Sequence, residues 1–440
     1  MKNQNHQLLN LLTLKGKICI DSRKAENGAI FFALKGDNFD GNRFAADALK
    51  AGCVKAVIDD PAFKKNDQYI LVDDVLSFLQ EMAKDYRKKL AVPFLGITGT
   101  NGKTTTKELC QLVLSRSFNS FATQGNLNNH IGVPVTILAL KHPHDLAVIE
   151  MGANHVGEIA ALSEIAMPTH GLITNIGKAH LEGFGSLDNI EKAKTELYRF
   201  VKKQEGTLFV NGDDERMIKY ADYPNAVTYG KQPDFHCIGT ITKHIPFLEI
   251  SFETHKDFGA LKGKTSGTIK TKLTGSYNFG NVMAAITIGL YFGVPLKDVI
   301  QAIEGYTPQN NRSQIVKTQK NTVLMDAYNA NPTSMVAALE NFQLIKNQPK
   351  SVFLGDMLEL GEDAEKEHEQ IVKWLNQHPS WVKVLVGNNF QSVTSGHNDV
   401  TTFLNATEAA TWLKDQPVSG HHILIKGSRG IQMEQLLKYL

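Results

Sequence analysis

A glycine-rich segment between a buried-strand pattern and a helical pattern constrains this chain more than any other feature. Residues 98–106 read Thr-Gly-Thr-Asn-Gly-Lys-Thr-Thr-Thr and follow an apolar run that ends at Ile97. Glycines let successive backbone N–H groups and a helix N-terminus face a phosphate, while Lys103 offers a mobile charge and Thr104 a hydroxyl for magnesium. ATP is therefore the first ligand that the sequence predicts. Ile97 stands where the strict phosphate-loop pattern has glycine, so this is a variant loop whose glycine is Gly99.

The composition indicates an ordinary globular protein of several domains. Its 440 residues exceed the roughly 100 to 200 of one domain. The 47 Lys and Arg against 45 Asp and Glu leave a net charge of +2. Such a small charge gives no strong electrostatic field that would favour binding to nucleic acid or anionic membranes. The cysteines are far apart in apolar surroundings, so we expect buried free thiols at Cys19, Cys53, Cys110 and Cys237.

The chain begins with a leucine-rich segment at 8–14 that polar residues interrupt. It lacks a small-residue cleavage site, so we expect a short amphipathic helix rather than a signal peptide. No stretch approaches the ~18 consecutive apolar residues that span a bilayer. We expect a cytoplasmic protein without membrane insertion.

Short apolar runs alternate with helical patterns, which predicts an α/β fold with three domains. A small α/β N-domain is expected over 1–92, with strands at 17–20, 29–33 and 55–58 and a helix at 44–51. A central parallel-sheet P-loop ATPase domain is expected over 93–308, with strands at 146–149 and 172–176, antiparallel strands within 235–273 and a helix after Asn278. A doubly wound, Rossmann-like domain is expected over 309–440, with strands at 322–325, 351–354, 383–386 and 422–425.

Polar residues just past the strands are the candidates for chemistry, because ligands of parallel sheets bind beyond the carboxyl ends of the strands. Glu150 ends one apolar run, and His180 lies in a glycine-containing loop after another. Glu150 alone is also consistent with a helix cap or a salt bridge, and His180 alone with a surface residue. His142 and His144 have no third ligand nearby in sequence, so a solvated turn is expected there.

Lys194 lies in the apolar stripe of a helical pattern over 188–203. A protonated amine that faces a core is costly unless it reaches solvent, finds a partner or loses its charge. The sequence leaves two readings open, a lysine that extends to solvent and a lysine that is modified or paired in an active site.

Further polar residues come later in the chain. Asn278 and Asn281 flank a helix start, where their amides read a base or cap the helix. Arg312 follows the second domain boundary, where it contacts phosphates or remains a surface cation, and Asp326 ends a strand where it would accept a ribose hydroxyl.

Together these residues resemble the Mur ligases, which form amide bonds with ATP in bacterial cell-wall synthesis. The similarity lies in Thr-Gly-Thr-Asn-Gly-Lys-Thr-Thr at 98–105, the glutamate at 150, Asn-x-Gly-x-x-His at 175–180 and Ala-Lys-x-x-Leu-Tyr at 193–198. Within the family, three further segments resemble the branch that adds a dipeptide, namely 125–134, 326–332 and 354–361. MurE-type ligases usually show Tyr-Ala-His-Thr-Pro-Asp where this chain has Tyr-Asn-Ala-Asn-Pro at 328–332.

The resemblance implies a reaction that joins D-alanyl-D-alanine to UDP-N-acetylmuramoyl-tripeptide through an acyl phosphate, in a monomer that binds no nucleic acid. It implies a carbamylated Lys194 and two Mg²⁺ sites, one at Thr104 and Glu150 and one at His180 and Lys194. With Lys103, the residues Glu150, His180 and Lys194 would be catalytic. ATP would be bound by Gly99, Thr100, Asn101, Gly102, Lys103, Thr104, Thr105, Asn278, Asn281, Arg312 and Asp326.

The substrates would be bound by residues of all three domains. The candidates are Ser22, Arg23, Phe32, Gly36, Asp40, Asn126, Asn128, Asn129, Tyr328, Asn329, Lys426 and Ser428. Two other functions remain open, a MurE-type or folylpolyglutamate-type ligase of the same fold, and a non-catalytic ATP-binding scaffold.

Overall fold

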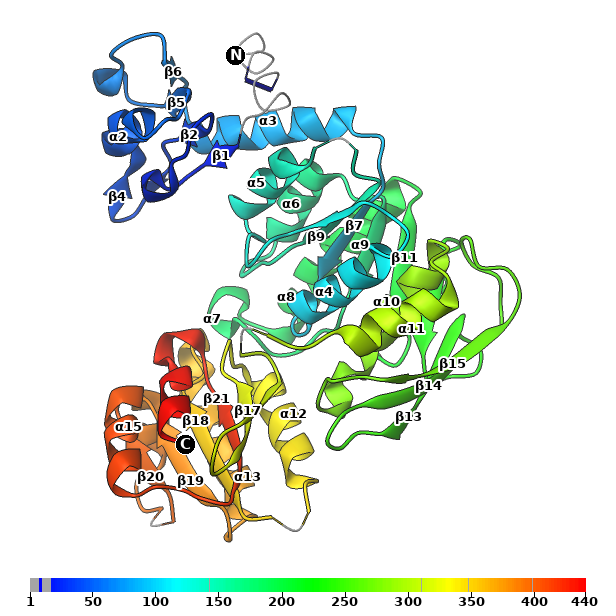
Figure 1. Ribbon diagram of the computed structural model, residues 1–440, viewed down its shortest axis with the longest axis vertical. Coiled ribbons are helices and arrows are strands. Elements are labelled where there is room, and N and C mark those ends of the chain that lie inside the picture. The colour runs from blue at the N-terminus through cyan, green and yellow to red at the C-terminus, as the bar shows by residue number, and fades with distance from the viewer. Residues whose placement is uncertain (1–7, 10–16, 142, 310, 347, 398) are drawn as a thin grey trace.

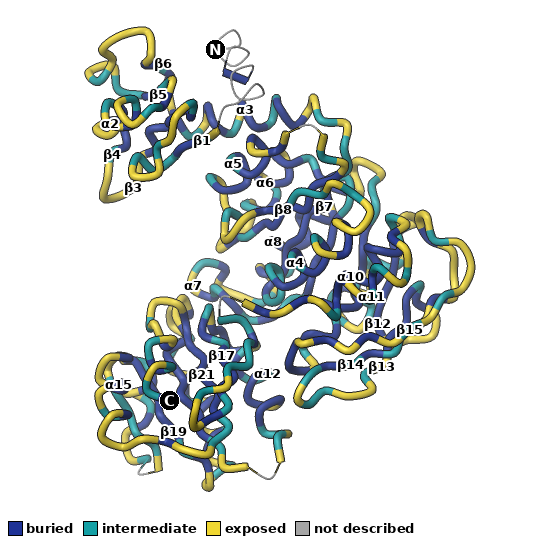
Figure 2. Tube along the Cα trace, viewed as in Figure 1, coloured by how far each residue is buried: buried dark blue, intermediate teal, exposed yellow. Residues whose placement is uncertain are grey.

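The computed structural model describes residues 8–9, 17–141, 143–309, 311–346, 348–397 and 399–440. Three main sheets follow one another along the chain, and Figure 1 shows the central one between the other two. Buried positions concentrate in the strands, while exposed positions concentrate in the loops (Figure 2). The α/β fold class predicted from the sequence is confirmed.

The N-terminal part contains a four-stranded parallel sheet in the order β1-β2-β5-β6. Its elements are β1 (Ile18–Cys19), β2 (Ile30–Phe32), the hairpin β3 (Lys35–Gly36) and β4 (Phe39–Asp40), α2 (Ala45–Lys50), β5 (Lys55–Ile58) and β6 (Tyr69–Leu71). Of the leucine-rich start, Leu8 and Leu9 are buried, and the rest of the helix expected there lies outside the described residues.

Helix α3 (Val75–Lys89) joins the N-terminal part to the central part and packs on α5 and α6. Arg87 fixes this contact, because its guanidinium donates to Ala166 O at 2.8 Å and Met167 O at 3.0 Å. The same guanidinium lies 3.7 Å from the centre of the Phe94 ring, and burial lowers its pKa to about 10. The last helix before the proposed boundary at 92 is therefore built into the central part.

The central sheet has nine strands in the order β15-β14-β13-β12-β11-β10-β7-β9-β8. It is parallel from β8 to β13 and antiparallel from β13 to β15, as the sequence pattern predicted. The strands are β7 (Phe94–Thr98), β8 (Ser120–Ala122), β9 (Leu146–Glu150), β10 (His170–Ile173), β11 (Thr207–Asn211), β12 (Ala226–Gly230), β13 (Cys237–Lys243), β14 (Glu249–Thr254) and β15 (Thr265–Lys270).

Helices cover both faces of this sheet, which explains why its strands are continuous apolar runs. In β9, Ala147 and Ile149 face one hydrophobic core, while Leu146 and Val148 face the other. The first core includes α5 (Gly132–Ala139), α6 (Glu158–Ala166), α7 (Leu181–Phe184), α8 (Leu187–Lys194) and α9 (Glu196–Lys203). The second includes α4 (Lys103–Leu114), α10 (Phe279–Tyr291) and α11 (Leu296–Gly305).

The C-terminal sheet has six strands in the order β16-β17-β21-β18-β19-β20. The four strands predicted from the sequence form its parallel centre, and two further strands flank them, with β16 antiparallel to β17. The strands are β16 (Gln314–Lys317), β17 (Thr322–Asp326), β18 (Lys350–Gly355), β19 (Val382–Val386), β20 (Thr401–Phe403) and β21 (His422–Lys426). The main helices are α12 (Pro332–Gln343), α13 (Ala364–Asn376), α14 (Asn388–Val393) and α15 (Ala406–Asp415).

Two local predictions were wrong. The helical pattern over 188–203 is two helices, α8 and α9, separated at Thr195, whose hydroxyl donates to Glu191 O at 2.8 Å. Glu196 is buried in this second helix, and its carboxylate accepts the Gly157 and Ala160 N–H groups at the start of α6, both at 2.8 Å. Strand β10 ends at Ile173 rather than Ile176, because the following residues bend over the glycine-rich loop.

All four cysteines are free and buried, as predicted. Among the helices in the described part of the chain, none combines the length and apolar character needed to cross a membrane. His144 is half-buried and packs against Phe121, so it is not the solvated residue that was expected, while His142 falls outside the described residues.

His170 at the start of β10 gives the fold a testable pH dependence. Its ring packs on Phe209, Tyr291 and Phe292, and burial lowers its pKa to about 4. The unfolded chain takes up this proton near pH 6.5, so the free energy of unfolding should fall as pH drops from about 6.5 to about 4, by up to ~3 kcal/mol. Denaturant unfolding at several pH values should show a shallower dependence in His170→Gln than in the exposed control His255→Gln. Equal slopes in the two variants would contradict this assignment.

Candidate active site

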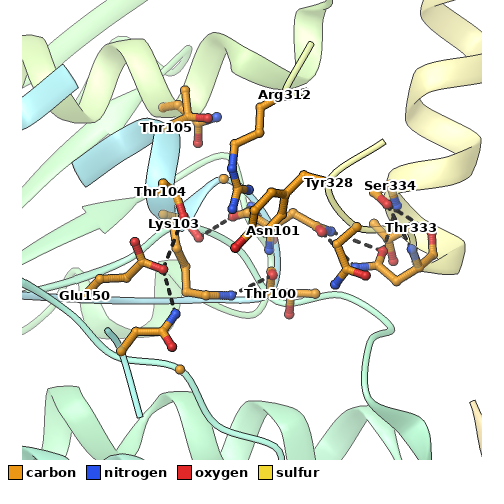
Figure 3. Close-up of a pocket in the computed structure, with 18 of the residues that line it drawn as sticks. Thr100, Asn101, Lys103, Thr104, Thr105, Glu150, Arg312, Tyr328, Thr333 and Ser334 are labelled. Atoms are coloured by element: carbon orange, nitrogen blue, oxygen red, sulfur yellow. Dashed lines mark hydrogen bonds between the residues drawn. The ribbon is translucent and has the colours of Figure 1, made fainter. Parts of the chain in front are cut away.

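The glycine-rich loop connects β7 to α4 and opens into a cavity of about 800 Å³ (Figure 3). Two glycines are required by close packing. A Cβ on Gly99, at φ +142°, would lie 2.0 Å from Thr174 Oγ1, and one on Gly102, at φ +78°, would lie 2.4 Å from Asn281 Oδ1. Helix α4 then begins at Lys103, so its free backbone N–H groups face the cavity. The variant loop thus has the geometry of an anion site.

Lys103 lies folded over its own loop. Its ammonium donates to Gly99 O at 2.8 Å and to Thr100 O at 3.0 Å. Burial lowers the pKa of Lys103, while the nearby Glu150 carboxylate acts in the opposite direction. The charge is therefore held at the mouth of the loop by two carbonyl groups, whose place a phosphate oxygen can take.

Glu150 ends β9 beside the start of α4, where the strand pattern placed it. Its Oε1 accepts from Asn128 Nδ2 at 2.8 Å and from the Thr104 hydroxyl at 3.2 Å. Its Oε2 is buried and has no hydrogen-bond partner among the residues that the structure describes. An unpaired buried carboxylate oxygen is costly, and a hard divalent cation beside a threonine hydroxyl would satisfy it. Glu150 and Thr104 thus fit a Mg²⁺ site, although the described residues contain no cluster of three His, Cys, Asp or Glu that could hold a metal.

Lys194 ends α8 and is 2% exposed, so its side chain does not extend to solvent. Its amine donates to Ala153 O at 3.1 Å and lies 5.0 Å from the centre of the Phe184 ring. No carboxylate pairs with it among the described ion pairs, and burial lowers its pKa to about 7. A large fraction of this amine is therefore neutral at physiological pH. Lys194 is outside the lining of the cavity.

His180 lines the cavity in the left-handed conformation, at φ +50°, just before α7. Its Nδ1 makes a short contact with the carboxylate of Glu359, which comes from the C-terminal part. The carbonyl of Glu359 also accepts the Glu182 N–H at 3.2 Å. The structure therefore joins the predicted metal ligand His180 to a carboxylate that sequence reasoning missed.

Asn278 and Asn281 line the cavity, but their amides are engaged within the protein. Asn278 donates to Thr274 O, and Asn281 donates to Asn278 Oδ1, both at 2.8 Å. Asn281 Oδ1 accepts the Thr106 hydroxyl at 3.0 Å. Both residues are buried, and Asn281 contacts α4 through Thr106, so these atoms are not free to read a base.

Arg312 and Asp326 both line the cavity. The Arg312 guanidinium stacks 3.5 Å from the centre of the Tyr328 ring, close to the loop, as Figure 3 shows. Asp326 accepts from Lys426 Nζ at 2.5 Å and from the Ser313 N–H at 3.0 Å. A ribose hydroxyl would have to share the Asp326 carboxylate with these donors.

The structure brings together only part of the predicted substrate-binding set. The cavity is lined by Asn126, Asn128, Asn129, Tyr328, Asn329 and Lys426. It does not include Ser22, Arg23, Phe32, Gly36, Asp40 or Ser428. Phe32 is fully buried in its own core, so its side chain is closed to a substrate, and Ser428 instead accepts the Leu358 N–H and donates to Ala330 O.

Sequence reasoning missed the residues that join the central and C-terminal parts. Asn331, the N-cap of α12, donates to Asn101 Oδ1 of the glycine-rich loop at 2.8 Å. Lys178 forms an ion pair at 2.6 Å with Glu367, which is buried in α13. Asn331 lies in the segment 326–332 that carries the family resemblance, but its position before a helix equally fits a simple cap.

Comparisons with known proteins agree with this geometry. Three protein-family models match the chain. They are "Mur ligase family, catalytic domain" at residues 17–87, "Mur ligase middle domain" at 97–289 and "Mur ligase, glutamate ligase domain" at 311–429. The chain belongs to the Mur ligase family.

Relatives within the family are similar over nearly the whole chain. UDP-N-acetylmuramoyl-tripeptide–D-alanyl-D-alanine ligase of Bacillus subtilis (strain 168) is 34% identical over 434 residues, which are 96% of this chain and 92% of that protein. The crystal structure of MurF from Acinetobacter baumannii superimposes with a TM-score of 0.85 at 31% identity, covering 98% of this chain and 97% of that one. MurF ligase from Thermotoga maritima in complex with ADP shares the fold, with a TM-score of 0.84 at 24% identity and the same coverage.

Proposed function

We propose that this chain is an ATP-dependent ligase that joins D-alanyl-D-alanine to UDP-N-acetylmuramoyl-tripeptide, giving ADP, phosphate and the pentapeptide precursor of peptidoglycan. The observation that carries the proposal is the buried, unpartnered Oε2 of Glu150 beside the phosphate loop. The names of the full-length relatives support the choice of substrates. We further propose that it acts as a monomer in the cytoplasm, with the domain limits 1–92, 93–308 and 309–440.

The reaction begins with a poor electrophile, because the negative charge of the tripeptide carboxylate is delocalised. Transfer of the ATP γ-phosphoryl group gives an acyl phosphate, which has a good leaving group. The dipeptide amine then forms the new C–N bond and loses a proton, and inorganic phosphate leaves with the bonding electrons.

The loop residues position this transfer. Backbone N–H groups at the start of α4 and the Lys103 ammonium would face the phosphates, and Arg312 lines the same cavity. Mg²⁺ at Thr104 and Glu150, with a second ion at His180 and carbamylated Lys194, would neutralise charge on the transferring group. The contacts of Asn331 and Lys178 hold the C-terminal part over the loop, which would keep water from the acyl phosphate.

The test is a turnover assay of ADP release with UDP-N-acetylmuramoyl-tripeptide, ATP and different amines. We expect release to depend on D-alanyl-D-alanine, and tripeptides ending in meso-diaminopimelate and in lysine should be compared. Single amino acids, including glutamate, should not replace the dipeptide. Turnover with an amino acid instead would indicate a MurE-type or folylpolyglutamate-type ligase, and nucleotide binding without turnover would indicate a scaffold.

A further inference from the structure

Four carboxylates line the cavity, and they belong to Glu150, Glu158, Asp326 and Glu359. Three of them already have a place in the structure. Glu158 accepts the backbone N–H groups of Asn154 and His155, at 2.7 and 3.2 Å. Asp326 is paired with Lys426, and Glu150 lies buried against the start of α4. Glu359 is the remaining carboxylate of the cavity, and its ion-pair partner among the described residues is His180.

Glu359 differs from the others in exposure and in backbone conformation. Its side chain is 54% exposed and reaches the cavity from the C-terminal part. Glu359 at φ +62° and His180 at φ +50° are both left-handed without being glycine. Such conformations cost free energy and persist where the surroundings hold them, often at functional sites. A carboxylate is thus held facing the cavity at the boundary between two parts of the chain.

Glu359 lines the same cavity as the phosphate loop. His180 lies in the segment after β10, and β10 is the direct neighbour of β7, which carries the phosphate loop. On the central side the cavity presents Lys103 and backbone N–H groups, which suit anions. Glu359 contributes a negative group from the C-terminal side, and a negative group suits a cationic ligand.

We infer that Glu359 binds the ammonium group of the incoming dipeptide and, once one proton has passed from it to water, holds the neutral amine nitrogen beside the activated carboxyl carbon. The inference rests on the proposed function, which supplies a zwitterionic dipeptide as the second substrate. The dipeptide arrives with a charged amino group, and an unneutralised ammonium loses hydration when it enters the cavity. A charge-assisted contact to Glu359 replaces that hydration and selects against acceptors that lack the positive charge.

The test compares Glu359→Gln with a matched control, Glu362→Gln, which changes an exposed glutamate of the same turn outside the cavity. Glutamine keeps a hydrogen-bond acceptor for His180 and removes the charge. We expect the KM for D-alanyl-D-alanine to rise by about 10- to 100-fold, as for loss of a hydrogen bond to a charged group. The KM values for ATP and tripeptide and the half-saturating Mg²⁺ concentration should stay within about twofold of the control.

A second measurement does not depend on turnover. D-lactyl-D-alanine carries a hydroxyl in place of the ammonium, and its affinity and that of D-alanyl-D-alanine can be measured by calorimetry with tripeptide and a non-hydrolysable ATP analogue. The unsubstituted protein should prefer the dipeptide, and Glu359→Gln should lose most of this preference.

Each other outcome overturns the inference. An unchanged dipeptide KM and an unchanged preference would reduce Glu359 to a contact that joins two parts of the chain. A raised Mg²⁺ requirement with an unchanged dipeptide affinity would make it a metal ligand. Absence of dipeptide-dependent turnover in the unsubstituted protein would instead contradict the proposed function itself.

Discussion

Replacing Lys194 by alanine should lower kcat by about a thousandfold or more, the scale expected for loss of a group that stabilises charge in phosphoryl transfer. The side chain is buried, its amine has one backbone carbonyl as hydrogen-bond partner, and its pKa is lowered to about 7 by burial. Carbon dioxide adds to a neutral amine, forming an N–C bond with loss of one proton. A buried lysine of this kind can therefore become a carboxylate-like ligand, whereas an ordinary surface lysine stays protonated.

The measurement is kcat for ADP release with and without added acetate or formate. A short carboxylate that enters the space left by Lys194→Ala should partly restore activity. Lys192→Ala is the matched control, because Lys192 is exposed on the same helix. Full activity of Lys194→Ala without a carboxylate would exclude the proposed role, and equal losses in both variants would point to damage to α8.

Much of the fold was predictable because the spacing of apolar residues along the chain indicates which positions are buried. Runs such as 55–58 and 422–425 match β5 and β21 closely, since their strands are buried on both faces. Strands β16 and β20 escaped prediction because edge strands bury only part of their side chains and give a weak pattern. The break at Thr195 was also not predicted, because the buried apolar stripe continues across it from Ala193 to Leu197.

The site was predictable where one strand end fixes a side chain, and not where two segments meet. Glu150 and Thr104 adjoin in the structure because β9 and β7 are neighbours in the sheet. Asp326 and Lys426 were both selected for ligands, but their pairing depends on the register of β17 with β21, which places them directly opposite each other. A sequence pattern does not contain that register.

The contacts between the central and C-terminal parts lay furthest beyond sequence reasoning. Asn101 and Asn331 are 230 positions apart, and Lys178 and Glu367 are 189 positions apart. Each side chain alone is an ordinary cap, turn or surface residue. These contacts form only when the central and C-terminal parts pack together, and the same packing brings Glu359 to the cavity.

Replacing Glu150 by glutamine should lower kcat by about a thousandfold and raise the Mg²⁺ concentration needed for half-maximal rate. Glutamine can keep the acceptor that serves Asn128 and Thr104. Its amide nitrogen would stand where Oε2 now lies buried without a partner, and an NH₂ group cannot ligate a cation. The change therefore removes a metal ligand while leaving the volume and most contacts of the side chain intact.

Stability separates this role from a structural one. Removing a buried charge that lacks a full set of partners should leave the free energy of unfolding unchanged or raise it by about 1 kcal/mol, measured without Mg²⁺. A structural carboxylate would instead give a less stable variant. The control is Glu164→Gln, because Glu164 is 59% exposed on α6 and makes a 3.8 Å surface ion pair with Lys84. If the Glu150→Gln variant kept its kcat and its Mg²⁺ dependence, Glu150 would not be a metal ligand.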